Sequence, residues 1–293
     1  MILSSASFTS VAFWPSGLAV LAYLLASVWP IGGLSSQTEN NPGGDRPVWF
    51  WLSLGWLAQA AAILLDAIAL NEPIARARFG FAPALSVTTW LVLAVYAVES
   101  RQLGLPSVRR ALAGLAACAV VLAWLFPGQT HPMSGSPWAP LHWLTGFASY
   151  GLIGAALLHA ALLRHAEKQM RATSGGSGQI PAPGALPGQA LGMPLLRLES
   201  LTLRFVAAGF IMLSLTLILG AWFATPWKWD HKTVFSVMSW AVFATLLVGR
   251  ARFGWRGRQA VRWLIAGSTL LLLAYVGSRF VLEVVLHRSV ANY

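Results

Sequence analysis

The chain has 293 residues, of which 57% are hydrophobic and only 10% are charged. Soluble domains carry about 25% charged residues, so this composition excludes them and indicates an integral membrane protein. The net charge of +11 would suit nucleic acid, but its distribution over alternate loops indicates membrane topology instead, and we expect no nucleic-acid partner.

Apolar runs of about 20 residues recur along the chain, and each is long enough to cross a hydrocarbon core of about 30 Å. Only helices and closed barrels satisfy their backbone groups in lipid, and these runs are too long and too uniformly apolar for barrel strands. The predicted helices are residues 8–29, 48–70, 81–99, 108–127, 138–163, 203–224, 232–249 and 260–286. The sequence thus predicts an all-α fold, a polytopic membrane helical bundle of about eight transmembrane helices in a single integral-membrane domain over residues 1–293.

The basic residues define a predicted orientation. Fourteen of the 20 Lys and Arg residues lie on or beside the first, third, fifth and seventh loops. The positive-inside rule places these loops in the cytoplasm and both termini on the external, periplasmic side. Residues 1–10 hold no Lys or Arg, so the first run lacks the basic region of a signal peptide and is predicted to be a retained helix. We expect a multi-pass protein of a bacterial inner membrane, with membrane lipid as a partner.

Few polar residues interrupt the first five helices. Asp66 lies near the outer end of the second helix, where it can pair with a buried base or reach interfacial water. Cys118 is the only cysteine, which excludes an intrachain disulfide and a Cys-x-x-Cys pair. The fifth helix carries His142 at its outer end and His159 and His165 at its cytoplasmic end. The last two are predicted to be interfacial, because His142 and His159 are about 25 Å apart along a helix and cannot share a ligand.

The second half begins with residues 171–194, which are rich in Gly, Pro and Ala and predict a flexible cytoplasmic linker. The last helix carries Arg279 and Glu283, four residues apart, so that they share a face and can pair. An arginine at membrane depth needs a partner, and the candidates are Glu283, Asp66 or the carboxylate of a ligand.

The loop between the sixth and seventh helices is unusually aromatic. It holds Trp227, Trp229, Asp230 and His231 together with two lysines, Lys228 and Lys232. The predicted topology brings this loop to the same external boundary as His142 and His287. Two neutral imidazoles can supply both axial ligands of a haem iron, while indole rings offer apolar surface and cations such as Lys228, Lys232 or Arg279 can bind propionates. The alternative is an aromatic belt with interfacial histidines.

Four segments carry a resemblance to a known family. They are Leu141-His142-Trp-Leu-Thr-Gly-Phe-Ala-Ser149-Tyr150, Trp227-Lys-Trp229-Asp230, Gly254-Trp255-Arg256-Gly257 and Ala274-Tyr275-Val276-Gly277-Ser278-Arg279-Phe280. Over residues 138–287 the chain resembles the cytochrome c assembly protein family, the haem-handling membrane proteins of CcsA and CcmC type, and is most similar to its YpjD/HemX-like branch. The resemblance implies that His142 matches the first external haem-ligand histidine, and that Trp227, Trp229 and Asp230 match the core of the tryptophan-rich motif. His287 lies about one residue out of register with the second external histidine.

The chain also departs from the family pattern. Trp222 stands five residues before Trp227 and lacks the glycine that follows it in the family, His231 replaces a proline, and Val248 stands where some members carry a histidine. The sequence contains no nucleophile–base pair, no phosphate-binding glycine loop and no carboxylate cluster with metal spacing. It therefore predicts an assembly or binding component rather than a complete synthetase.

Three functional hypotheses follow. The first is a haem-binding or haem-handling inner-membrane protein linked to cytochrome c assembly, which works with other assembly proteins. In it, haem is held at the external face by His142, by His287 or His231, and by the tryptophan loop. The second is a cofactor-free membrane scaffold or regulator, for example of tetrapyrrole synthesis. The third is a transporter whose pathway is lined by Asp66, Arg279 and Glu283.

Overall fold

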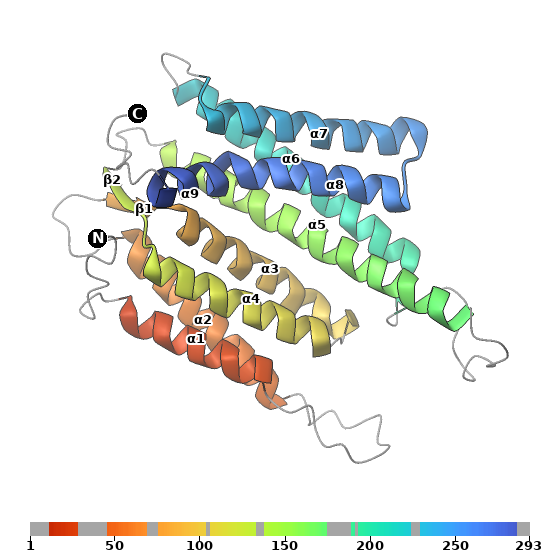
Figure 1. The fold of residues 1–293 in the computed structure, drawn as a ribbon, viewed down its shortest axis with the longest axis horizontal. Coiled ribbons are helices and arrows are strands. Elements are labelled where there is room, and N and C mark those ends of the chain that lie inside the picture. The colour runs from red at the N-terminus through yellow and green to blue at the C-terminus, as the bar shows by residue number, and fades with distance from the viewer. Residues whose placement is uncertain are drawn as a thin grey trace. The chain divides into compact units, whose positions relative to one another are not determined.

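The computed structural model describes residues 12–28, 46–68, 76–103, 106–132, 138–174, 189–190, 193–223 and 229–285. Over these ranges the chain forms eight helices, the last of which continues through two π-helical segments (Figure 1). The helices are α1 Phe13–Val28, α2 Arg46–Ile68, α3 Phe81–Leu103, α4 Pro106–Leu125, α5 Ala139–Ser174, α6 Leu195–Phe223, α7 His231–Phe253 and α8 Gly257–Leu272. The continuation of α8 consists of η1 Leu273–Gly277, α9 Ser278–Phe280 and η2 Val281–Val285.

Seven of the described helices are long and apolar enough to cross a membrane, namely α2 to α7 and α8 with its continuation. The exception is α1, whose 16 residues extend for about 24 Å. The prediction of a helical, multi-pass membrane protein is thus confirmed. The helix α5 runs to Ser174, beyond residue 163 and into the predicted linker, because its polar end extends the helix past the apolar run.

Two short antiparallel strand pairs accompany the helices, which the all-α prediction did not include. Strand β1 (Arg76–Phe79) pairs with β2 (Gln129–Pro132), and β3 (Gln189–Ala190) pairs with β4 (Met193–Pro194). The first pair joins the connection after α2 to the connection after α4. These two loops therefore lie on one side of the helices, as the alternation of transmembrane helices requires.

The contacts divide the chain into two units. Unit 1 comprises Met1–Leu93, Leu105–Ser136 and Val276–Tyr293, and unit 2 comprises Ala94–Gly104 and Pro137–Tyr275. The prediction that all helices form a single domain stays a prediction.

Buried polar side chains connect the helices of unit 1. The Tyr23 hydroxyl on α1 donates to Gln59 Oε1 on α2 over 2.6 Å, and Gln59 Nε2 donates to the Ser86 hydroxyl on α3 over 3.0 Å. Next to them, the rings of Trp56 and Trp90 stack with their centroids 4.7 Å apart. Such hydrogen bonds between small or polar groups hold helices together in lipid, where apolar packing alone discriminates poorly.

Unit 2 packs α5, α6, α7 and α8 around an apolar core (Figure 1). The core side chains are Ile153, Ala156, Ala160, Val206, Leu213, Phe243, Leu246, Val261, Leu264 and Leu271. The turn between α7 and α8 is fixed at Gly254, which ends α7 with a φ of 65° that favours glycine. Two ion pairs support this turn, because Glu199 on α6 accepts from Arg250 at 3.2 Å and from Arg256 at 3.3 Å.

Candidate functional site

The candidate site is built around His142, in the first turn of α5. This half-buried side chain places Nδ1 3.0 Å from the backbone carbonyl oxygen of Thr216 on α6. A carbonyl oxygen can only accept a hydrogen bond, so its partner Nδ1 carries the proton and donates. In the neutral ring the lone pair then resides on Nε2. Histidines that bind a metal through one nitrogen are held in this way through the other.

The backbone of α6 forms one side of the His142 position. A Cβ atom added to Gly220 would lie 3.2 Å from His142 Cε1, so the close approach of helix and ring requires glycine or a shift of the imidazole. Hydroxyl groups join the two helices at the same level: Thr216 Oγ1 donates to Thr145 Oγ1 over 3.0 Å, and Thr145 Oγ1 donates to the His142 carbonyl oxygen over 3.0 Å. These contacts fix the ring between α5 and α6.

A cation from α7 completes this arrangement. The charge of Lys232, in the first turn of α7, acts electrostatically on His142. Its Nζ atom lies 5.7 Å from the centroid of the Tyr275 ring in η1, which is a cation–π distance. The helices α5, α6 and α7 of unit 2 therefore contribute to the surroundings of His142. Lys232 is one of the cations that the sequence suggested for anionic groups, and within unit 2 its charge acts on this histidine.

The described part of the tryptophan loop is exposed. Trp229 has 69% of its surface exposed, and Asp230 and His231 are exposed beside it. The Asp230 carboxylate accepts a hydrogen bond of 2.8 Å from the Thr233 backbone N–H and forms the N-cap of α7. This cap determines where α7 begins. His231 is the first residue of the helix, and Trp229 immediately precedes the cap. Trp227, Lys228 and His287 lie outside the described residues.

Arg279 belongs to unit 1, in the short α-helical segment between η1 and η2. Its charge acts on the Glu283 carboxylate, which also accepts a hydrogen bond from the Phe81 backbone N–H. The predicted pairing of these residues assumed a regular α-helix, whereas Glu283 lies in a π-helical segment. Through Glu283, Arg279 is tied to the start of α3.

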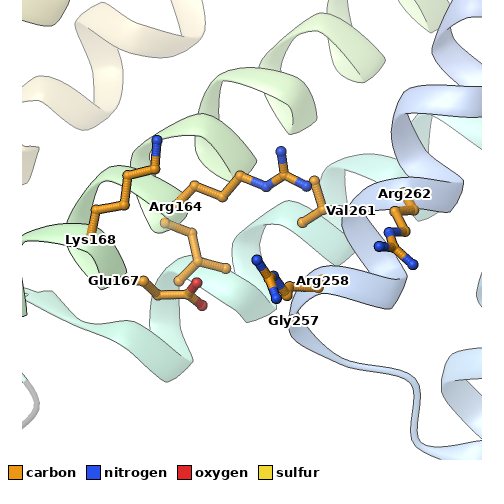
Figure 2. A pocket seen from close by; sticks show the side chains of 8 residues that line it. Arg164, Glu167, Lys168, Gly257, Arg258, Val261 and Arg262 are labelled. Atoms are coloured by element: carbon orange, nitrogen blue, oxygen red, sulfur yellow. The ribbon is translucent and has the colours of Figure 1, made fainter. Parts of the chain in front are cut away.

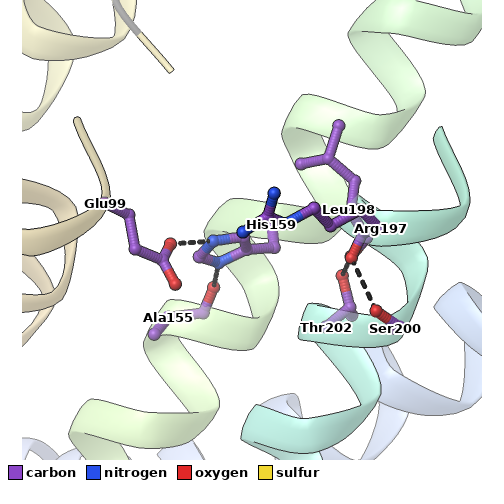
Figure 3. A network of polar contacts seen from close by, with 7 residues as sticks. All are labelled: Glu99, Ala155, His159, Arg197, Leu198, Ser200 and Thr202. Carbon is purple, nitrogen blue, oxygen red and sulfur yellow. Dashed lines mark hydrogen bonds and ion pairs between the residues drawn. The ribbon is translucent and has the colours of Figure 1, made fainter. Parts of the chain in front are cut away.

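The sequence predicted His159 to be interfacial but gave no sign that its side chain is buried within the helices. This side chain is fully buried in unit 2, where Nδ1 lies 2.7 Å from the Ala155 carbonyl oxygen and Nε2 pairs with Glu99 of α3 (Figure 3). Its ring stacks on Phe205 of α6, with centroids 5.1 Å apart. Sequence reasoning missed the pair because its members are 60 residues apart; the one available signal was a glutamate near the end of an apolar run.

No group of three or more His, Cys, Asp or Glu side chains able to hold a metal ion occurs among the residues that the structure describes.

Comparisons with known proteins identify the family of this chain. Residues 76–286 match the family model described as cytochrome C assembly protein. The chain is 30% identical over 162 residues to the cytochrome c biogenesis protein CcsA of Parasynechococcus marenigrum (strain WH8102), which covers 50% of this chain and 53% of the relative. It is 27% identical over 269 residues to CcsA of Prochlorococcus marinus (strain MIT 9313), covering 79% of this chain and 85% of the relative.

The first of these alignments spans about half the length of the relative it matches. The family model, in contrast, extends from β1 to the end of the described part of the last helix and includes His142, the tryptophan loop and Arg279. This is a multi-pass membrane protein, and it belongs to the cytochrome c assembly protein family.

Proposed function

We propose that this protein binds haem at the external face of the bacterial inner membrane, as a component of cytochrome c assembly, and that His142 Nε2 is one axial ligand. The observation that carries the proposal is the hydrogen bond from His142 Nδ1 to the Thr216 carbonyl oxygen. It assigns the proton to Nδ1 and orients the lone pair of Nε2, as in histidines that ligate metals.

The chemistry of the residues near His142 supports this proposal. The close approach of Gly220 to His142 leaves the ring a defined position against α6, and the Lys232 ammonium can pair with a propionate. The exposed indole of Trp229 offers apolar surface. The second axial ligand is His231 or His287, and Trp227, Arg279 and His287 enter the proposal from the sequence alone. When bound, haem would supply an iron that these histidines would ligate.

The same proposal includes the orientation and the branch of the family. The positive-inside distribution supports cytoplasmic odd-numbered loops and external termini, and the pairing of β1 with β2 supports a common side for the second and fourth loops. The length and the C-terminal motif favour the YpjD/HemX-like branch.

An absorption spectrum of the detergent-purified, full-length protein from haem-replete cells tests the proposal. We expect a Soret band that His142→Ala largely removes, and that imidazole added to His142→Gly restores. The matched control is His165→Ala, which removes an exposed histidine of the same helix about 35 Å away along its axis. A Soret band equally strong in His142→Ala would contradict the proposed ligand.

The alternative is a cofactor-free membrane scaffold or regulator. It predicts that protein from haem-replete cells lacks a Soret band and that a co-purifying partner persists in His142→Ala. In a haem-binding component, by contrast, the interaction with other assembly proteins should weaken when His142 is replaced.

A further inference from the structure

A basic pocket lies in unit 2, far along α5 from His142. Its volume is ≈ 330 Å³, and it opens between the C-terminal part of the α5 span and the first turns of α8 (Figure 2). Four cations line it, namely Arg164 and Lys168 of α5 and Arg258 and Arg262 of α8. The buried side chains of Leu163 and Val261 form its inner, apolar wall.

The side chains that line this pocket carry a net positive charge. Glu167 is the one carboxylate that lines it, and in Figure 2 it points toward Arg258. Within the described residues no ion pair of the four cations is found, whereas the nearby turn pairs both Arg250 and Arg256 with Glu199. Four cations around one carboxylate leave a net positive pocket, which favours an anionic ligand.

The beginning of α8 adds to this preference. The helix starts at Gly257, which lines the pocket, and its N-cap residue Arg256 makes no side-chain capping bond. The N–H groups of a helix's first turn lack intrahelical acceptors and attract anions. This feature supplements the four side-chain charges, on which the inference rests.

The pocket lies at the boundary of the membrane. Arg164 and Lys168 are at the end of the candidate span Ala139–Lys168, while Arg258 and Arg262 are at the start of the span Gly257–Val285. Both sets therefore reach the same membrane face at the level of the lipid headgroups. An apolar inner wall below a cationic rim suits a molecule with a phosphate attached to an apolar body, and basic pockets between transmembrane helices bind such headgroups.

We infer that this pocket binds the phosphate headgroup of an anionic phospholipid. The occupant is a lipid rather than soluble phosphate because the pocket joins the cations to buried apolar side chains at headgroup depth. This site is separate from the proposed haem position at the other end of α5, and occupancy of one does not require occupancy of the other.

Native mass spectrometry of the full-length protein, titrated with cardiolipin, phosphatidylglycerol or phosphatidylcholine, tests the inference. We expect the double variant Arg258→Gln/Arg262→Gln to bind the two anionic lipids about 25-fold more weakly, because each cation near the surface contributes about fivefold. The matched control is Arg204→Gln/Arg252→Gln, which removes two exposed arginines that do not line the pocket, and it should retain the affinity. Thermal unfolding and the Soret band should be the same in both variants.

Three outcomes would overturn the inference. They are an equal loss in the control variant, equal binding of phosphatidylcholine, and displacement of the lipid by inorganic phosphate at equal concentration. The last would assign the pocket to a soluble anion.

Discussion

The imidazole of His142 donates from Nδ1 to a backbone carbonyl oxygen on another helix. A backbone acceptor fixes the tautomer as well as a carboxylate does, but every residue has one. It therefore leaves no mark in the sequence. Residue type and predicted depth identified His142 as a candidate, whereas its partner Thr216 could only be found once α5 and α6 were placed.

The contact between Gly220 and His142 yields a test at one atom. Alanine at position 220 would place its Cβ 3.2 Å from His142 Cε1, so the ring must move by a few tenths of an ångström. We expect Gly220→Ala to lower the Soret absorbance per mole of protein, by less than His142→Ala does. Gly146→Ala is the control, because its Cβ would meet only Thr216 Cγ2 at an ordinary 3.7 Å. Equal spectra for the two variants would show that the position of the ring tolerates the added methyl group.

The buried pair of Glu99 and His159 is predicted to contribute to stability rather than to haem binding. Removing one member of a buried ion pair leaves the other without compensation, at a cost of about 3 kcal/mol. We therefore expect Glu99→Ala to lower the free energy of unfolding by about this amount. Glu99→Gln, whose amide oxygen can still accept from Nε2, should lose less.

Denaturant unfolding in detergent, followed by near-ultraviolet circular dichroism, measures these changes. The double variant Glu99→Leu/His159→Leu should recover much of the loss, because apolar replacements of a whole buried pair are often tolerated. If the double variant loses as much free energy of unfolding as Glu99→Leu and His159→Leu lose together when made singly, the two residues are not coupled.

At the scale of elements, the start of α7 is determined by Asp230. Its carboxylate accepts a hydrogen bond from the Thr233 N–H. The residue that the family resemblance assigned to the tryptophan-rich motif therefore has a structural role. Replacing an N-cap aspartate by alanine costs about 1 kcal/mol, whereas asparagine caps equally well. We predict faster amide hydrogen exchange over residues 231–234 in Asp230→Ala but not in Asp230→Asn. If haem binding falls in Asp230→Asn while exchange is unchanged, Asp230 contacts the cofactor directly.

The continuation of α8 shows where sequence patterns stop being informative. Hydropathy predicted one helix over residues 260–286, and the chain is helical from Gly257 to Val285, yet two segments have π-helical hydrogen bonding. A π turn changes neither the length of an apolar run nor its mean hydropathy. It does change which side chains share a face, so the spacing of Arg279 and Glu283 predicted their interaction but not its geometry.

For the whole molecule, hydropathy was sufficient for the order of the helices and for seven long ones, because lipid requires each to be long and apolar. The remaining predicted span, residues 8–29, corresponds among the described residues to the 16-residue helix α1. Hydropathy could not identify the two strand pairs, since four-residue segments such as β1 carry no distinctive pattern. It also gave no sign that His159 is buried, because the burial of a histidine depends on which helices cover it. The basic pocket was visible only as charge near two loops until α5 and α8 were placed side by side.

Accessibility labelling tests the orientation of the whole chain. In a Cys118→Ser background, Thr130→Cys lies in β2 after α4, and Phe253→Cys lies at the exposed end of α7, with α5, α6 and α7 between them. Three crossings put the two positions on opposite faces, and the positive-inside rule assigns the Arg-rich turn near Phe253 to the cytoplasm. A membrane-impermeant maleimide should therefore label Thr130→Cys in intact cells and Phe253→Cys only after permeabilisation. The reverse pattern would invert the topology and move His142 to the cytoplasmic face, and labelling of both in intact cells would mean that one of the three helices does not cross.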